Sequence, residues 1–211
     1  MRTGFSLRIG RAALAAVIAL SVTAFSLTGV AQALTFFDPV SGSFKTIDQR
    51  YSTNRKPPAK YNRQTVRYTG GEAPGTIIID SSRHFLFFVL PGNRAVRYGV
   101  GVGREGFGWK GKVRVARKTE WPRWIPPREM ISREPRLKKY AGGMPGGPSN
   151  PLGARALYLF DGGRDTLYRI HGTNEPWTIG LNVSSGCIRL NNDDIIDLYG
   201  RVQVGAPVVV L

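Results

Sequence analysis

The stretch HGTNEPWTIGLNVSSGCIRLNN, residues 171–192, organises the chain: it follows an expected strand at residues 167–170 and leads into an expected short helix. Cys187 is the only cysteine of the chain, and His171 is one of its two histidines. The thiolate is the nucleophilic form of cysteine, and a thiol is mostly protonated near neutral pH, so a reactive cysteine needs a neighbouring base or cation. His171 is the candidate base, and the pattern predicts cysteine-based acyl transfer.

The residues before Cys187 distinguish this hypothesis from its alternative, a small buried hydrophobic cysteine in the core. Ser184, Ser185 and Gly186 place little side-chain bulk next to the sulfur. Such bulk must be absent where backbone N–H groups approach a substrate oxygen, and glycine also adopts strained turn conformations. A core cysteine needs neither property, so the local sequence favours a nucleophile.

The stretch resembles the signature of the bacterial L,D-transpeptidases, the YkuD family, in which His-Gly is followed by Ser-His-Gly-Cys-(Ile/Val)-Arg. This chain has His171-Gly172 and then SSGCIR at residues 184–189, with Ser185 in place of the second histidine. The similarity extends from about Gly75 to Leu211. It implies a mainly β catalytic domain, a β-sandwich or barrel with one or two short helices, and it leaves His171 as the base.

The resemblance also implies the chemistry of each site residue. Cys187 attacks a carbonyl of a peptidoglycan stem peptide, while His171 takes the thiol proton and the backbone carbonyl of Gly172 orients the imidazole ring. The backbone N–H groups of Gly186 and Cys187 hold the oxyanion. A thiol paired with His171 is expected to react below its ordinary pKa of about 8.5.

The substrate contacts and the acceptor stay open in the sequence. Arg189, Ser185 and Trp177 are the candidate substrate-binding residues, and a structural salt bridge is an equal alternative for Arg189. The acceptor is a second stem, which gives a 3-3 cross-link, or the Lys of an anchored lipoprotein, or water, which makes the enzyme an L,D-carboxypeptidase. A non-catalytic wall-binding protein is the alternative of another class.

Residues 1–33 have the pattern of a secretory signal peptide, with three arginines, an uncharged apolar run and Ala31-Gln32-Ala33 as the cleavage site. The apolar run of 19 residues, Ala12 to Val30, also keeps an uncleaved membrane anchor open. Either alternative places the body of the protein in the periplasm or facing the cell wall. A single cysteine cannot form a disulfide within the chain, which adds weight to a functional thiol.

Charge and composition limit the partners. The net charge of +16 falls to +13 when the arginines of the signal are removed, which favours anionic wall or membrane polymers as partners. We expect no nucleic acid partner, because the sequence has no recognisable binding module. We expect no metal, because one cysteine and two histidines make no common zinc spacing. The thioester chemistry that the resemblance implies requires no cofactor.

The expected organisation is a linker or N-terminal arm at residues 34–72, rich in charge, Pro and Gly, before a single catalytic domain at 73–211. Apolar and alternating segments predict the strands of that domain, and no crossover pattern indicates a parallel α/β sheet. His84 falls in one such segment and is interpreted as structural. We expect Asn191 or Asn192 to cap a helix that ends at Gly200. The expected strands lie at residues 76–79, 84–90, 94–100, 112–117, 154–159, 167–170 and 206–211.

The region from Glu120 to Pro151 interrupts the strand pattern with seven prolines and four glycines. Long loops of this kind inside a compact domain often bind ligands or cover sites. Trp121 and Trp124 offer apolar contact area there, and a role as caps of the core is the equal alternative. The resemblance implies that this region borders the substrate cleft.

Overall fold

The computed structural model of this protein describes residues 33–38, 43–48, 56–104 and 108–211. The predicted signal segment, residues 1–33, lies outside this part of the chain except for Ala33. In the described residues, no helix is both long enough and apolar enough to cross a membrane. Strands β1 (Ala33–Asp38) and β2 (Ser43–Asp48) pair antiparallel with each other.

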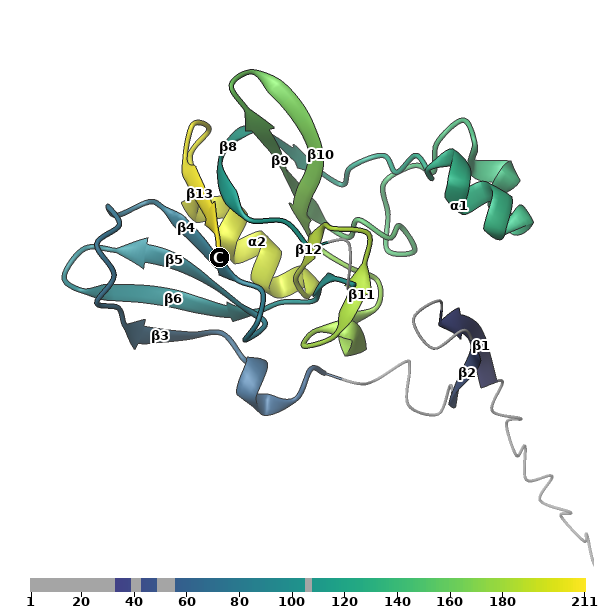
Figure 1. Ribbon diagram of the computed structural model, residues 1–211, viewed down its shortest axis with the longest axis horizontal. Helices are drawn as coiled ribbons and strands as arrows, with labels where there is room; N and C mark the ends of the chain where they lie inside the picture. Colours follow the sequence, from purple (N-terminus) through teal and green to yellow (C-terminus); the bar gives the residue numbers. More distant parts are fainter. Residues whose placement is uncertain (1–32, 39–42, 49–55, 105–107) are drawn as a thin grey trace, which may run out of the picture. The chain divides into compact units, whose positions relative to one another are not determined.

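The described residues from 56 onward are built on one nine-stranded sheet with the order β12-β10-β9-β8-β13-β4-β5-β6-β3 (Figure 1). A second, two-stranded sheet pairs β7 with β11. The strands are β3 (Gln64–Arg67), β4 (Ile77–Asp80), β5 (Phe85–Leu90), β6 (Arg94–Gly99), β7 (Val102–Gly103), β8 (Gly111–Glu120), β9 (Arg155–Asp161), β10 (Arg164–His171), β11 (Asn182–Ser184), β12 (Ile188–Arg189) and β13 (Pro207–Val210). The helices are α1 (Arg128–Arg133) and α2 (Asn192–Arg201), with short 3-10 turns η2 (Ala59–Tyr61), η3 (Pro135–Tyr140) and η4 (Pro176–Thr178).

The expectation of a mainly β domain with short helices is confirmed. Most neighbouring strands are antiparallel, but β13 pairs parallel with β4, and β12 pairs parallel with β10. The segment between β10 and β12 returns the chain to the same end of the sheet, and α2 then carries it from β12 at the sheet edge to β13 in the middle of the sheet. The sheet is therefore mixed.

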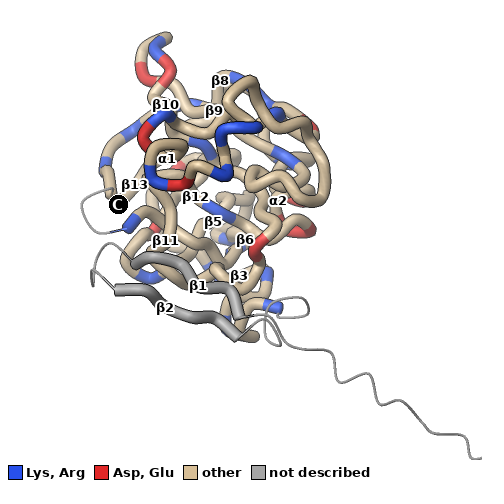
Figure 2. The backbone as a smooth tube through the Cα atoms, turned by 90° about the vertical axis from the view of Figure 1, so that its right-hand side faces the viewer, with Lys and Arg blue, Asp and Glu red and all other residues tan. Residues whose placement is uncertain are grey.

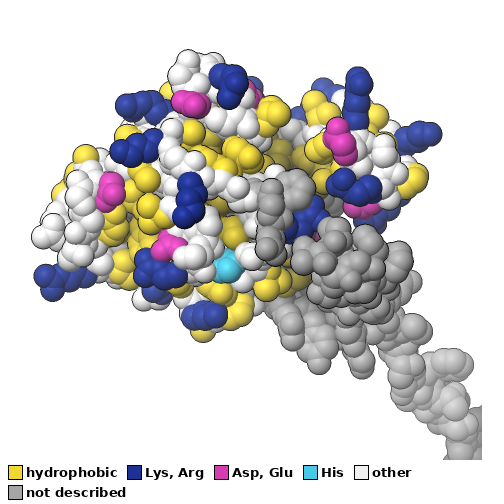
Figure 3. Space-filling model, viewed as in Figure 1, with side chains coloured by type: hydrophobic (Ala, Val, Ile, Leu, Met, Phe, Trp, Pro, Cys, Tyr) yellow, Lys and Arg dark blue, Asp and Glu magenta, His cyan; other side chains and the backbone are white. Residues whose placement is uncertain are grey.

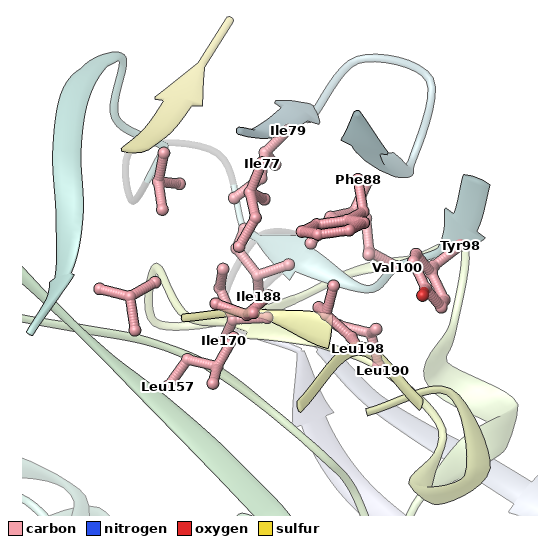
Figure 4. Close-up of a cluster of buried hydrophobic side chains, with 14 of the residues drawn as sticks. Ile77, Ile79, Phe88, Tyr98, Val100, Leu157, Ile170, Ile188, Leu190 and Leu198 are labelled. Atoms are coloured by element: carbon pink, nitrogen blue, oxygen red, sulfur yellow. The ribbon is translucent and has the colours of Figure 1, made fainter. Parts of the chain in front are cut away.

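The core lies between the two halves of this sheet and α2, and Figure 4 shows its apolar side chains directed toward one another. The β-branched run of β4 is buried along its length because neighbours cover both of its faces. Leu198 of α2 is fully buried among these strands, so its truncation to alanine is expected to cost about 2–5 kcal/mol. Core members from the two halves include Ile77, Ile79, Phe88, Leu157, Leu159, Ile170 and Ile188.

Helix α2 begins where its sequence indicates. The side chain of Asn191 accepts a hydrogen bond of 2.9 Å from the backbone N–H of Asp194, which makes Asn191 the N-cap. Asp193 and Asp194 lie in the first turn and Arg201 in the last, where each complements the helix dipole. The expected end at Gly200 is wrong by one residue, because Arg201 is still helical.

Two expectations for the N-terminal half of the domain differ from the structure. The expected linker at residues 34–72 contains β3, which pairs with β6 at the sheet edge, and Tyr61, which is 7% exposed. An edge strand pairs on one side only and tolerates polar and charged residues, so its sequence lacks the apolar pattern by which strands are predicted. His84 is outside the strand: it has a φ of 61° in the turn before β5, and its Nε2 lies 2.7 Å from Oδ1 of Asn182.

The region 120–151 is more ordered than a loop. It contains α1 and η3, and backbone hydrogen bonds between Trp124 and Met144 close it. Asn150 is fully buried at its base, where the side-chain amide donates to the carbonyls of Pro122 and Pro145 at 3.0 and 2.9 Å. Trp121 is 45% exposed, which does not fit a cap on the core.

Candidate active site

Strands β10 and β12 bring the two halves of the site together. They pair in parallel, with Ile170 opposite Ile188 and His171 opposite Arg189. Successive side chains of a strand point to opposite faces, so the two isoleucines enter the core while His171 and Arg189 lie on the outer face. Cys187 comes two residues before Arg189 and shares a backbone hydrogen bond with Arg169, which places it in the same arrangement.

His171 is buried, and its ring is held by its own strand end. Its Nδ1 lies 2.5 Å from the backbone carbonyl oxygen of Gly172. A carbonyl only accepts hydrogen bonds, so in the neutral ring Nδ1 carries the proton. A second backbone hydrogen bond, with Leu152, also holds the ring. Burial, and then the charge of Arg189, lower the pKa of His171 to about 3, so the imidazole is neutral at physiological pH.

Cys187 is half-buried, and burial raises the pKa of its thiol. The backbone hydrogen bond with Arg169 and the charges of Arg169 and Arg189 act in the opposite direction without overcoming burial. At rest Cys187 is therefore a thiol and His171 a neutral imidazole. Burial disfavours both the thiolate and the imidazolium, so the directions of the two pKa shifts run against the expectation of a thiol that reacts below its ordinary pKa.

The turn before the sulfur is held by Ser184. Its hydroxyl donates to the carbonyl of Cys187 at 2.5 Å and accepts from the N–H of Gly186 at 3.1 Å. Gly186 has a φ of 106°, a conformation that explains the glycine in the sequence. The N–H of Gly186 thus has an internal acceptor, so its predicted role as an oxyanion donor requires that this hydrogen bond be released. Ser185 is exposed, and its hydroxyl accepts from Arg104 Nη2 at 3.5 Å.

The other predicted contacts lie on the segment between His171 and Cys187 and next to it. Arg189 makes an ion pair with Glu175, with 3.0 Å between Nη1 and Oε2, which supports the structural alternative for this arginine. Its backbone also pairs with Gly101 through hydrogen bonds of 2.8 and 2.9 Å. Trp177 is half-buried in η4, on the segment that connects the two catalytic candidates.

Arg169 is a site residue that the sequence analysis missed. It lies two positions before His171 on β10, so the alternation of the strand places both on one face. Its guanidinium binds both carboxylate oxygens of Asp165 at 2.7 Å, and it lies 4.4 Å from the ring centre of Tyr158. The only signal in the sequence was this spacing of two residues.

The basic charge is distributed over the surface. Figure 2 shows Lys and Arg positions spread along several strands and loops, and Figure 3 shows their side chains on the visible face with apolar side chains between them. Within the described residues, no group of three or more His, Cys, Asp or Glu side chains could hold a metal ion.

Comparison with known proteins decides the family. The model of the YkuD family, described as the L,D-transpeptidase catalytic domain, matches residues 74–210. This chain belongs to that family. It is 38% identical over 144 residues to the probable L,D-transpeptidase ErfK/SrfK of Escherichia coli K12, a match that covers 64% of this chain and 43% of the relative. It is also 38% identical over 138 residues to the probable L,D-transpeptidase YbiS of that strain, covering 63% and 43%.

Among solved structures, a Brucella melitensis protein is 51% identical to this L,D-transpeptidase family member, with a TM-score of 0.51, and the match covers 73% of this chain and 96% of that one. That protein is described as a probable carnitine operon oxidoreductase. The name belongs to that protein, while the family assignment rests on the match at residues 74–210. The matched region spans less than half the length of the two Escherichia coli relatives.

Proposed function

We propose that this chain is a peptidoglycan L,D-transpeptidase that forms 3-3 cross-links through a thioester on Cys187. One observation carries the proposal: β10 ends at a neutral imidazole whose Nδ1 is occupied by the Gly172 carbonyl, and the parallel strand beside it, β12, begins directly after the thiol of Cys187. A neutral imidazole with an unprotonated Nε2 is the form that can take a proton from a nucleophile.

In the first half of the reaction, Cys187 Sγ attacks the carbonyl between the third residue of a donor stem and its terminal D-Ala. His171 Nε2 takes the thiol proton as the S–C bond forms, and the N–H of Cys187 stabilises the oxyanion. The tetrahedral intermediate collapses to a thioester, and His171 returns the proton to the leaving amine of D-Ala.

In the second half, the amine of an acceptor stem attacks the thioester. His171 takes a proton from this amine, a new amide bond forms, and the thiol is regenerated when the proton returns to sulfur. Because both resting groups are neutral and burial disfavours the charged form of each, charge appears on them together, and the resulting pair of opposite charges is stabilised in a site of low dielectric constant.

The cellular setting belongs to the same proposal. Export by residues 1–33 delivers the domain to the periplasm or the wall-facing surface, where peptidoglycan is the available substrate. The mature net charge of +13, which follows from removal of the signal arginines, supports association with anionic wall or membrane polymers.

The test is incubation of the full chain with a disaccharide-tetrapeptide, followed by mass spectrometry of the products, with Cys187→Ala as the control. A cross-linked dimer that Cys187→Ala does not form is the expected result. Tripeptide alone would replace the transpeptidase with an L,D-carboxypeptidase. Transfer to a lipoprotein lysine in a parallel reaction would identify that acceptor. No product and no adduct on the intact protein would leave a non-catalytic wall-binding protein.

A further inference from the structure

One row of side chains crosses the outer face of the sheet and ends at the sulfur. Arg117 of β8 lies opposite Tyr158 of β9, which lies opposite Arg169 of β10. The backbone hydrogen bond between Arg169 and Cys187 extends the row to the nucleophile. Figure 1 shows the hairpin of β9 and β10 beside β8, in agreement with this register.

Irregularities of the sheet create the row. Between Val115 and Arg117 the register of β8 against β9 shifts by one residue, which turns Val115 into the core and Arg117 to the opposite face. The register of β10 against β9 also shifts, between Asp165 and Arg169. Bulges that re-aim a side chain are common next to active sites.

Tyr158 is buried by charged groups. Its exposed fraction is 9%, yet it is not a member of the central apolar cluster. The guanidinium carbon of Arg117 lies 3.8 Å from the ring centre, and that of Arg169 lies 4.4 Å from it. The ring therefore fixes both guanidinium groups in place. A ligand that binds them loses less free energy to the ordering of these side chains.

The two arginines differ in how their charge is used. Both oxygens of Asp165 bind Arg169, whose side chain is only 14% exposed, so this pair is largely neutralised. The hydrogen bond from Arg169 lowers the pKa of Asp165, and the charge of Arg117 contributes a smaller effect in the same direction. Arg117 is exposed, so it presents a positioned cation to solvent.

We infer that Arg117, held on Tyr158 by the Arg169–Asp165 pair, binds a free carboxylate of the donor stem on the N-terminal side of the scissile bond. This inference rests on the proposed function, because it assigns a substrate feature to the same site. The guanidinium of Arg117 lies over the ring of Tyr158 on β9, and two strand spacings, roughly 10 Å at about 4.8 Å each, separate β9 from the Cys187 end of β12. About three residues of extended peptide span that distance, which matches the part of a tetrapeptide stem that precedes the scissile bond.

The chemistry favours a carboxylate as the ligand of this site. A guanidinium offers a planar pair of N–H donors that matches the two oxygens of a carboxylate, and a positioned arginine gains more from this geometry than a mobile lysine does. Arg117 is therefore a specificity residue for acidic stems.

Equilibrium binding tests the inference apart from catalysis. In the Cys187→Ala background, a tetrapeptide stem with this carboxylate free is compared by calorimetry with the same stem amidated at this carboxylate. We expect the acidic stem to bind about tenfold tighter. Arg117→Gln should remove the preference by weakening the acidic stem alone, and Arg117→Lys should restore only part of it.

Arg67→Gln is the matched control, because Arg67 is an exposed strand arginine on β3 at the opposite edge of the sheet. It should retain the preference of the unaltered site. Equal binding of the two stems, or an equal loss of both in Arg117→Gln, overturns the inference. Thioester formation by the protein with Cys187 intact is measured separately. A preserved carboxylate preference without any thioester would refute the proposed function and support the binding site.

Discussion

The pH dependence of thioester formation tests the electrostatics of the site. An ordinary histidine base with a pKa of about 6.5 is only about 3% neutral at pH 5, so its rate falls about 30-fold between high pH and pH 5. Burial lowers the pKa of His171 to about 3, so the base stays neutral throughout that range. We therefore expect the rate to change less than about twofold between pH 7 and pH 5.

The assay follows the mass of the acyl-enzyme on Cys187 after rapid quenching, with the donor stem at saturating concentration. His171→Ala should lower the rate by about 10²- to 10⁴-fold at every pH in this range, as removal of a general base does. His84→Ala is the matched control, because His84 is the other histidine of the chain and lies in the turn before β5. It should retain the profile of the unaltered protein.

Two results would refute this reasoning. A 30-fold loss of rate at pH 5 that disappears only when His171 is replaced would show a solvated histidine instead of a buried one. Thioester formation by His171→Ala at an unaltered rate would show that this ring is structural and that another group takes the thiol proton.

Four further predictions address binding, the turn, stability and export. Carbapenems should acylate Cys187 and add their mass to the intact protein, with no adduct on Cys187→Ala. Ser185→Ala and Ser185→His should change thioester formation by less than about threefold, because this side chain is exposed and His171 supplies the base; a loss as large as that of His171→Ala would assign Ser185 a catalytic role. Because the pKa of His171 is lowered, the unfolded chain binds a proton between pH 6.5 and 3 that the folded chain does not. The free energy of unfolding therefore decreases as the pH is lowered through this window, by up to about 2 kcal/mol at pH 5. Denaturant titration of His171→Ala should show a smaller decrease. N-terminal sequencing of exported protein should begin at Leu34, and retention of residues 1–33 in a membrane fraction would identify an anchor instead.

The sequence by itself determined the local features of this protein. The β-branched and alternating segments predicted β4, β5, β8 and β10, because the periodicity of a strand depends only on residues that are neighbours in the sequence. The residues around Asn191 likewise predicted the helix start, because a cap needs only side chains within one turn. The nucleophile and base candidates followed from their residue types and their spacing.

Only the tertiary structure decided what depends on partners far apart in the chain. The edge strand β3 forms because β6 lies beside it, and no pattern within its four residues predicts that pairing. Arg117 and Arg169 reach Tyr158 because two register shifts align three strands. The sequence predicted a thiol activated at low pH, whereas burial raises the pKa of Cys187 and lowers that of His171. A pKa reports the solvent and charge around a group, and those are set by every element packed against it.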